Sequence, residues 1–160
     1  MGGIVMAVQN GLRTSRWQST VRALRFGVGL QVVCLLLPLL DLWVFGSVER
    51  HVEAAYPEWD AGEVAMDRNA IVIGLLIVGV LGLAGWLLSL WAAKRDRGVR
   101  ATVTTLFVLG MSALGAVAGA GGDPYNQYVP WWLGSTILVL LALPGSAAVL
   151  AAWFRDRGVR

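Results

Sequence analysis

The chain has 160 residues, of which 57% are hydrophobic and only 14% are charged, and its net charge at pH 7 is +3. A soluble domain of this length would carry about 25% charged residues, so the composition excludes an ordinary soluble protein. The charges cluster between four continuous apolar runs, near 23–45, 70–93, 101–120 and 131–154. Each run has the roughly 20 residues that a helix needs to cross a bilayer, whereas barrel strands are shorter and alternate. The sequence therefore predicts an all-α integral membrane protein, a four-transmembrane-helix bundle that fills 23–154 as a single domain.

The N-terminal segment 1–22 is predicted to be cytoplasmic or interfacial. It has no continuous apolar core followed by small residues, so we do not expect a cleaved signal peptide. The stretch 12–25 can form an interfacial helix, because its four arginines would lie among lipid head groups while Trp17 dips inward.

The first span carries a candidate polar face. Gln31, Cys34, Pro38 and Asp41 are spaced by three, four and three residues, which places them on one side of a helix. Pro38 should kink the helix and free a backbone carbonyl. A polar, kinked face of this kind could line a cavity.

Asp41 is the only acidic residue inside an apolar run. Carboxylates within a membrane are costly, and they often mark an ion path or a bound partner. The alternative is structural: Asp41 lies about one turn from the end of its span, where it could reach the head groups or pair with Arg50 or Arg68.

The loop 46–69 is the longest polar segment. Ser47–Tyr56 has helical spacing and is followed by Pro57, which disfavours a helical residue before it. Asp60 and Glu63 match a helix-capping pattern, so a helix starting there could run directly into the second span. His51 lies among acidic residues without a recognised metal-binding spacing, and we predict no metal site.

Glycines are frequent in the second and third spans. Small residues let membrane helices approach closely and gain van der Waals contact. The second span offers Gly82 and Gly85, and the third has a GxxxG motif at Gly115 and Gly119. We expect these glycines to pack helices, either within the bundle or against a partner, and favour packing within the bundle.

The hexapeptide Arg-Asp-Arg-Gly-Val-Arg occurs twice, at 95–100 and at 155–160. Each copy ends an apolar run, with basic residues where a helix C-terminus favours them and a glycine that could close the helix. We interpret both copies as cytoplasmic anchors, with 155–160 as a basic tail; binding of anionic lipid or an acidic partner is the alternative. The proposed anchor residues are Arg95, Arg97, Arg100, Arg155, Arg157 and Arg160.

Further matches at the same offset of sixty residues, such as Gly85 with Gly145, suggest that the second and fourth spans are copies. This pattern predicts a possible 2+2 internal repeat. Chance similarity between apolar helices is the alternative.

The positive charges lie on one side of the predicted membrane. The N-terminal segment, the 94–100 turn and the C-terminal tail hold eleven of the thirteen Lys and Arg residues, whereas the loops at 46–69 and 121–130 are acidic. Basic segments of membrane proteins stay in the cytoplasm. We therefore expect a multi-pass protein of the cell (plasma) membrane with both termini cytoplasmic.

Few residues could carry chemistry. The single cysteine excludes a dithiol enzyme, and the single histidine lies outside the spans. We expect no catalytic site and no cofactor, and the scattered basic residues do not indicate nucleic-acid binding. The leading hypothesis is a non-catalytic accessory or interaction subunit, whose partners are the lipid bilayer and another membrane protein or a second copy. The alternative is a small oligomeric transporter or channel that uses the face of Gln31 and Asp41.

Overall fold

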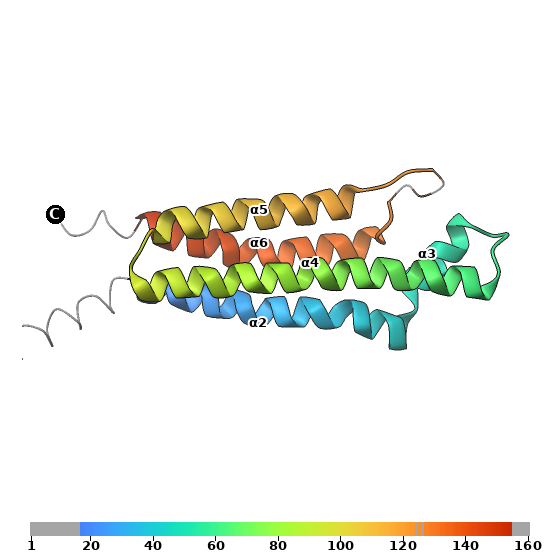
Figure 1. The fold of residues 1–160 in the computed structure, drawn as a ribbon, viewed down its shortest axis with the longest axis horizontal. Helices are drawn as coiled ribbons and strands as arrows, with labels where there is room; N and C mark the ends of the chain where they lie inside the picture. Colours follow the sequence, from blue (N-terminus) through green and yellow to red (C-terminus); the bar gives the residue numbers. More distant parts are fainter. Residues whose placement is uncertain (1–16, 124, 126, 155–160) are drawn as a thin grey trace, which may run out of the picture.

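Four long helices form the body of the protein (Figure 1). The structure, a computed structural model, describes residues 17–123, 125 and 127–154. Its helical elements are α2 (Gln18–Leu40), the π-helical segment η1 (Asp41–Phe45), α3 (Ser47–Ala55), α4 (Ala61–Arg95), α5 (Val99–Gly119) and α6 (Trp131–Phe154). By length and composition, α2 with η1, α4, α5 and α6 can each cross a membrane. This confirms the prediction of an all-helical protein with four apolar spans, and indicates a multi-pass membrane protein.

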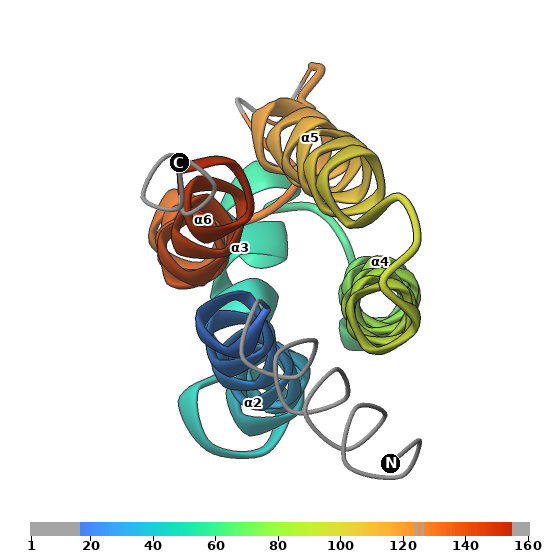
Figure 2. The same ribbon diagram turned by 90° about the vertical axis from the view of Figure 1, so that its left-hand side faces the viewer.

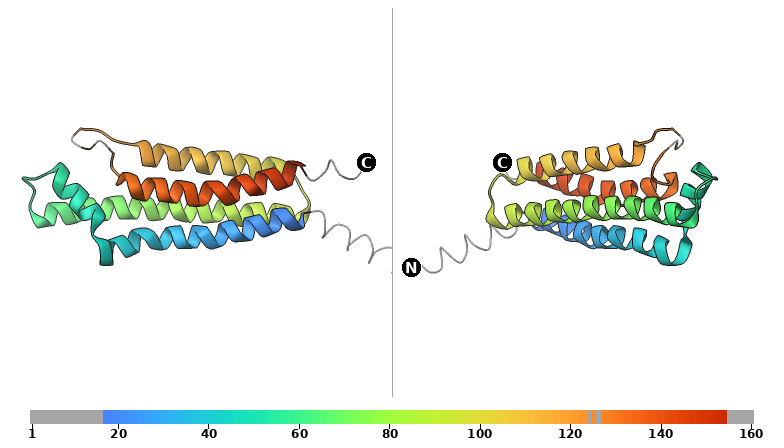
Figure 3. Two further views of the ribbon diagram at one scale, coloured as in Figure 1. Left: turned by 180° about the vertical axis from the view of Figure 1, so that it is seen from behind. Right: turned by 45° about the vertical axis from the view of Figure 1, so that its right-hand side comes forward.

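The four long helices form a ring in which each packs against two neighbours (Figure 2). Helix α2 contacts α4 and α6, and α5 contacts the same two helices from the other side. The chain runs up and down, so the α4–α5 turn lies at the same end as the start of α2 and the end of α6. Helix α3 and the 120–130 connection lie at the opposite end (Figure 3).

Helix α2 turns one narrow stripe of side chains toward the bundle. Its buried residues recur at alternating intervals of four and three, the spacing of a packed helical seam. The stripe consists of Thr20, Leu24, Gly27, Gln31, Cys34, Pro38 and Asp41. Helices α2 and α6 are the more buried pair: 22% and 33% of their span residues are buried, against 6% in both α4 and α5. Most of the apolar surface of α4 and α5 therefore faces outward.

Helix α4 is much longer than a membrane span. Its 35 residues correspond to about 52 Å, whereas the hydrocarbon core is about 30 Å thick. The helix begins with a reciprocal capping box: the Asp60 carboxylate accepts hydrogen bonds from the backbone N–H groups of Gly62 (2.7 Å) and Glu63 (2.9 Å), and the Glu63 carboxylate accepts one from the Asp60 N–H (3.1 Å). This confirms the predicted helix start and its continuation into the second span.

The extended part of α4 supports a small cap at the α3 end. Helix α3 ends at Ala55, before Pro57, as its sequence predicts. Val52 of α3, Val64 of α4 and Tyr125 of the second loop are buried together in this cap. The Tyr56 ring also stacks on Trp59, with 3.6 Å between the ring centroids. Helix α3 is thus held by an apolar core of its own.

The α4–α5 turn corrects the expectation that Gly98 closes the preceding helix. Helix α4 ends at Arg95, and Asp96 takes the left-handed conformation with a φ of 53°. Gly98, with a φ of 58°, is instead the residue before α5, and its carbonyl accepts the first helical bond, from the Thr102 N–H (2.9 Å). Aspartate tolerates the left-handed region better than most residues. The Trp17 indole N–H also donates to the Asp96 carboxylate, which fixes this side chain.

The helix predicted at 12–25 lies only partly within the described residues. From Gln18 onward this stretch is continuous with the first span, so the described part of it belongs to α2. Residues 1–16 and 155–160 lie outside the described residues, and with them the predicted anchors Arg155, Arg157 and Arg160.

Candidate functional site

The predicted polar face of the first span exists, but it does not form one site. Gln31, Cys34 and Asp41 are all buried on the inner side of α2. Ten residues separate Gln31 from Asp41, which corresponds to about 15 Å along the helix. Cys34, between them, lies in an apolar core with Val48 and Leu133. Each polar group therefore meets a different part of the bundle.

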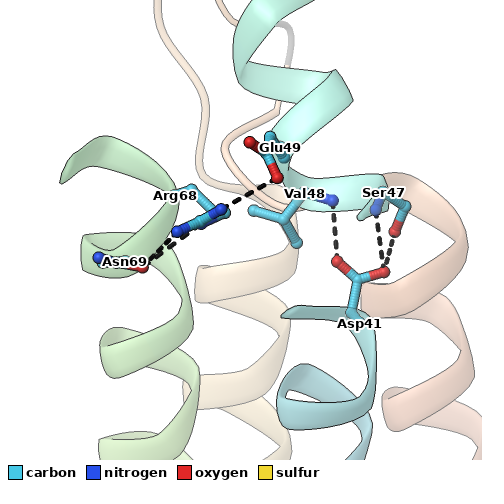
Figure 4. A network of polar contacts seen from close by, with 6 residues as sticks. All are labelled: Asp41, Ser47, Val48, Glu49, Arg68 and Asn69. Carbon is cyan, nitrogen blue, oxygen red and sulfur yellow. Dashed lines mark hydrogen bonds and ion pairs between the residues drawn. The ribbon is translucent and has the colours of Figure 1, made fainter. Parts of the chain in front are cut away.

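Asp41 caps the start of α3 (Figure 4). One carboxylate oxygen accepts hydrogen bonds from the backbone N–H of Ser47 (3.2 Å) and from the Ser47 hydroxyl, and the other accepts the N–H of Val48 (2.9 Å). Only 1% of Asp41 is exposed. These donors belong to the first turn of α3, where backbone N–H groups have no partner within the helix. A carboxylate at this position also suits the positive end of the helix dipole.

The backbone before α3 brings Asp41 to this position. Pro38 has no N–H, and the helix that follows it is wound as the π-helical segment η1. Gly46 then reverses the chain with a φ of 59°, and its N–H donates to the Asp41 carbonyl (2.6 Å). Glycine takes this left-handed conformation without the steric cost that a side chain would bring.

The predicted pairing of Asp41 with Arg50 or Arg68 is wrong. Arg68 of α4 instead forms an ion pair with Glu49 of α3 at 2.9 Å and also contacts Asn69 (Figure 4). Its guanidinium lies between α4 and α3 and is only partly exposed, while Asp41 lies beneath the first turn of α3. Asp41 and Arg68 thus fasten α3 independently, one by capping it and the other by a salt bridge.

Gln31 joins α2 to α4. Its amide N–H donates to the Gly79 carbonyl (2.9 Å), and its amide oxygen accepts from the Trp86 indole N–H (3.2 Å). The Trp86 ring lies against Gly27 so closely that a Cβ on Gly27 would come within 2.3 Å of it. Gly82 lies beside the Gln31 side chain, at 3.1 Å from a built Cβ. The Gln31 amide is therefore satisfied by α4.

A cavity of about 270 Å³ lies between α4 and α5. Residues of α2 and α6 form its floor, and its lining is almost entirely apolar. The two polar side chains in the lining already have hydrogen-bond partners. Gln31 bonds to Gly79 and Trp86, and the Ser89 hydroxyl donates to the Gly85 carbonyl (2.9 Å). Leu81 and Leu109, on its two walls, are 67% and 60% exposed. The cavity therefore opens sideways, between α4 and α5.

The four predicted packing glycines behave differently. Gly82 meets Gln31, whereas no atom of a neighbouring element lies within 4 Å of a Cβ built on Gly85, Gly115 or Gly119. Gly85 lines the cavity instead, and the two glycines of the GxxxG motif are exposed on α5. Close helix contacts occur at glycines that the sequence analysis did not single out for packing, chiefly Gly27 against Trp86 and Gly145 against Phe107.

Basic residues surround the α4–α5 turn. The Arg95 guanidinium lies over the Trp91 ring at 4.3 Å, and the Arg100 guanidinium donates to the Ala152 carbonyl near the end of α6 (3.1 Å). Lys94 and Arg97 are exposed, and neither side chain forms an ion pair or hydrogen bond within the described ranges. Two of the four cations are thus held by the fold, and two remain available at the surface.

An aromatic cluster at the α3 end includes none of the predicted site residues. The Tyr125 hydroxyl donates to the Asp67 carboxylate (2.6 Å), and its ring packs against those of His51, Tyr56 and Tyr128. Burial, followed by the hydrogen bond and negative charge of Asp67, raises the pKa of Tyr125. The available signal was the concentration of tyrosines in the two loops, with Tyr56 in the first and Tyr125 and Tyr128 in the second.

Comparison of the chain with protein-family models, with curated proteins and with solved structures found no match. The functional proposals below therefore rest on the residues and contacts of this chain.

Proposed function

We propose that the protein is a non-catalytic accessory or interaction subunit of a membrane complex, and that it meets its partner through the outer face of α5. The supporting observation is the position of the GxxxG motif. Gly115 and Gly119 are exposed, and a Cβ built on either glycine would have no atom of a neighbouring part of the described chain within 4 Å. Small residues of this spacing allow another helix to approach closely in lipid.

The alternative of a transporter or channel has less support. It relied on a continuous polar face, yet both oxygens of Asp41 are engaged by α3 and the Gln31 amide is engaged by α4. A transport role for Asp41 predicts that Asp41→Asn abolishes flux in proteoliposomes while the protein stays folded. Unchanged flux would exclude that role.

In-membrane crosslinking tests the proposed interface. A cysteine at Ser112, on the same exposed face of α5, should crosslink to a second polypeptide in native membranes, and the complex should survive mild detergent. Gly115→Leu with Gly119→Leu should lower the yield at least fivefold, because the larger side chains hold the helices apart. Gly74→Leu is the matched control, since a Cβ there also meets nothing within 4 Å. Recovery of monomer alone would contradict the proposal.

We also propose that both termini face the cytoplasm of a cell whose plasma membrane holds the protein. The support is the unequal distribution of Lys and Arg between the two ends of the bundle.

A 2+2 internal repeat is proposed because similar residues recur in the second and fourth spans at an offset of sixty positions. The order of the helices around the ring agrees with a repeat. If α2 and α4 trade places with α5 and α6, every pair of helices in contact is replaced by another pair in contact.

A further inference from the structure

The α4–α5 cavity has the length of an acyl chain in one leaflet. On α4 its lining extends from Val78 to Ser89, eleven residues or about 16 Å along the helix. Half of a hydrocarbon core of about 30 Å is about 15 Å. The cavity is thus as deep as the hydrocarbon part of the leaflet that adjoins the α4–α5 turn.

The volume of the cavity decides which kind of apolar molecule fits. A helix is about 10 Å across, so a 16 Å length of one fills on the order of 1,200 Å³. The cavity holds about 270 Å³ and therefore cannot admit a helix from another protein or from a second copy. A single hydrocarbon chain is thin enough. Gln31 and Ser89 already form hydrogen bonds within the bundle, and every other lining residue is apolar or aromatic, so the lining favours an apolar ligand.

The two exposed cations lie beyond the end of the cavity that adjoins the α4–α5 turn. Lys94 is five residues beyond Ser89 on α4, about 7 Å further toward the membrane surface, and Arg97 follows in the turn. Neither forms an ion pair or a side-chain hydrogen bond in the part of the chain that the structure describes. Basic residues at this depth attract anionic head groups.

We propose that this site binds an anionic phospholipid, with one acyl chain in the α4–α5 cavity and the phosphate against Lys94 and Arg97. The apolar cavity supplies a place for the chain, and the two cations select the charge of the head group. Binding would fill space that otherwise leaves Trp86 and Phe107 without packing partners on one side.

Native mass spectrometry of the delipidated full chain tests the site with two probes that share their acyl chains, dioleoylphosphatidylglycerol and dioleoylphosphatidylcholine. We expect one molecule of the anionic lipid to bind more tightly than the zwitterionic one. We expect each cation to contribute about a fivefold preference for the anionic lipid, so the double variant Lys94→Gln, Arg97→Gln should bind the two lipids equally. Arg50→Gln, at the opposite end of the bundle, should leave the preference unchanged.

The cavity is tested separately by filling it. Gly85→Leu should weaken binding of both lipids about tenfold, because the new side chain would take the place of several methylene groups of the acyl chain. Gly74→Leu is the control on the same helix, since both glycines have free space at Cβ but only Gly85 lines the cavity. Gly110→Leu, from the opposite wall, repeats the test if the first variant does not fold.

Three results would overturn the proposal. Equal affinity for the two lipids in the wild-type protein would remove the role of Lys94 and Arg97. Equal binding by Gly85→Leu and Gly74→Leu would show that the acyl chain lies elsewhere. Release of a bound polypeptide by Gly85→Leu, without any change in lipid binding, would identify a protein as the occupant.

Discussion

Asp41 illustrates how a single charged residue in an apolar helix can serve the fold. Removing a carboxylate from water is costly unless hydrogen bonds compensate for it. Here both oxygens accept from the start of α3, at the point where the chain leaves the first span. The buried carboxylate thus gains hydrogen-bond donors, and the N–H groups in the first turn of α3 gain an acceptor. The helical spacing places Asp41 on the same side of α2 as Gln31 and Cys34, but its partners depend on the reversal at Gly46, which no helical spacing could indicate.

Replacing Asp41 should therefore destabilise the α3 end of the bundle. We expect Asp41→Ala to lower the free energy of unfolding by about 1 to 2 kcal/mol, because the N–H groups of Ser47 and Val48 lose their acceptors. Asp41→Asn keeps one acceptor oxygen and should cost less. Denaturant unfolding in detergent, followed by circular dichroism, measures both. Asp60→Ala, which removes the exposed cap of α4, is the reference, and an Asp41→Ala variant as stable as wild type would contradict the capping role.

Tyr125 should make stability depend on high pH. Its folded-state pKa is raised above the usual value of about 10, so folding favours the protonated phenol. The contribution of Tyr125 is fully present below about pH 10 and is lost as the pH rises through the raised pKa. Tyr125→Phe should thus be about 1 kcal/mol less stable at neutral pH, with the difference from wild type shrinking above pH 10. Thermal unfolding across pH measures this. A constant difference would contradict it, and Tyr128→Phe is the partly exposed control.

At the scale of elements, the sequence predicted most of the helices because their signals are local. The start of α4 follows from the capping pattern of Asp60 and Glu63, and the end of α3 follows from Pro57. The wrong expectations involve contacts between elements. Gly98 looked like a helix end, yet Asp96 takes that conformation with help from Trp17, which is distant in sequence. Helix contacts likewise depend on which neighbour faces each glycine, and the sequence does not give the order of helices.

A matched series of glycine substitutions tests this view of helix packing. Gly27→Ala and Gly145→Ala should each cost about 1 to 3 kcal/mol, because the new methyl group would overlap the rings of Trp86 and Phe107. Gly115→Ala should be neutral or slightly stabilising, since its Cβ meets nothing and alanine favours helix. Thermal unfolding in detergent measures the series. Equal effects at all three positions would mean that the close contacts do not govern packing.

At the scale of the whole molecule, the two ends of the bundle differ in construction. The α3 end is closed by a cap with its own apolar core, an ion pair and an aromatic cluster. The opposite end has a short turn surrounded by cations, and beside it the α4–α5 cavity opens sideways. This asymmetry connects the charge distribution seen in the sequence with a shape that the sequence did not reveal. It also means that the two ends offer different chemistry to their surroundings.

The orientation of this asymmetric bundle can be measured with single cysteines. Because basic segments stay in the cytoplasm, we expect Glu53→Cys in α3 to react with a membrane-impermeant maleimide in intact cells. Arg97→Cys in the α4–α5 turn should react only after the membrane is opened. Both positions are exposed, so access through the membrane should be the main difference between them. The native Cys34 is buried, so the wild-type protein should remain unlabelled and serve as the control. Labelling of Arg97→Cys in intact cells, with protection of Glu53→Cys, would reverse the proposed topology and place Lys94 and Arg97 at the outer surface.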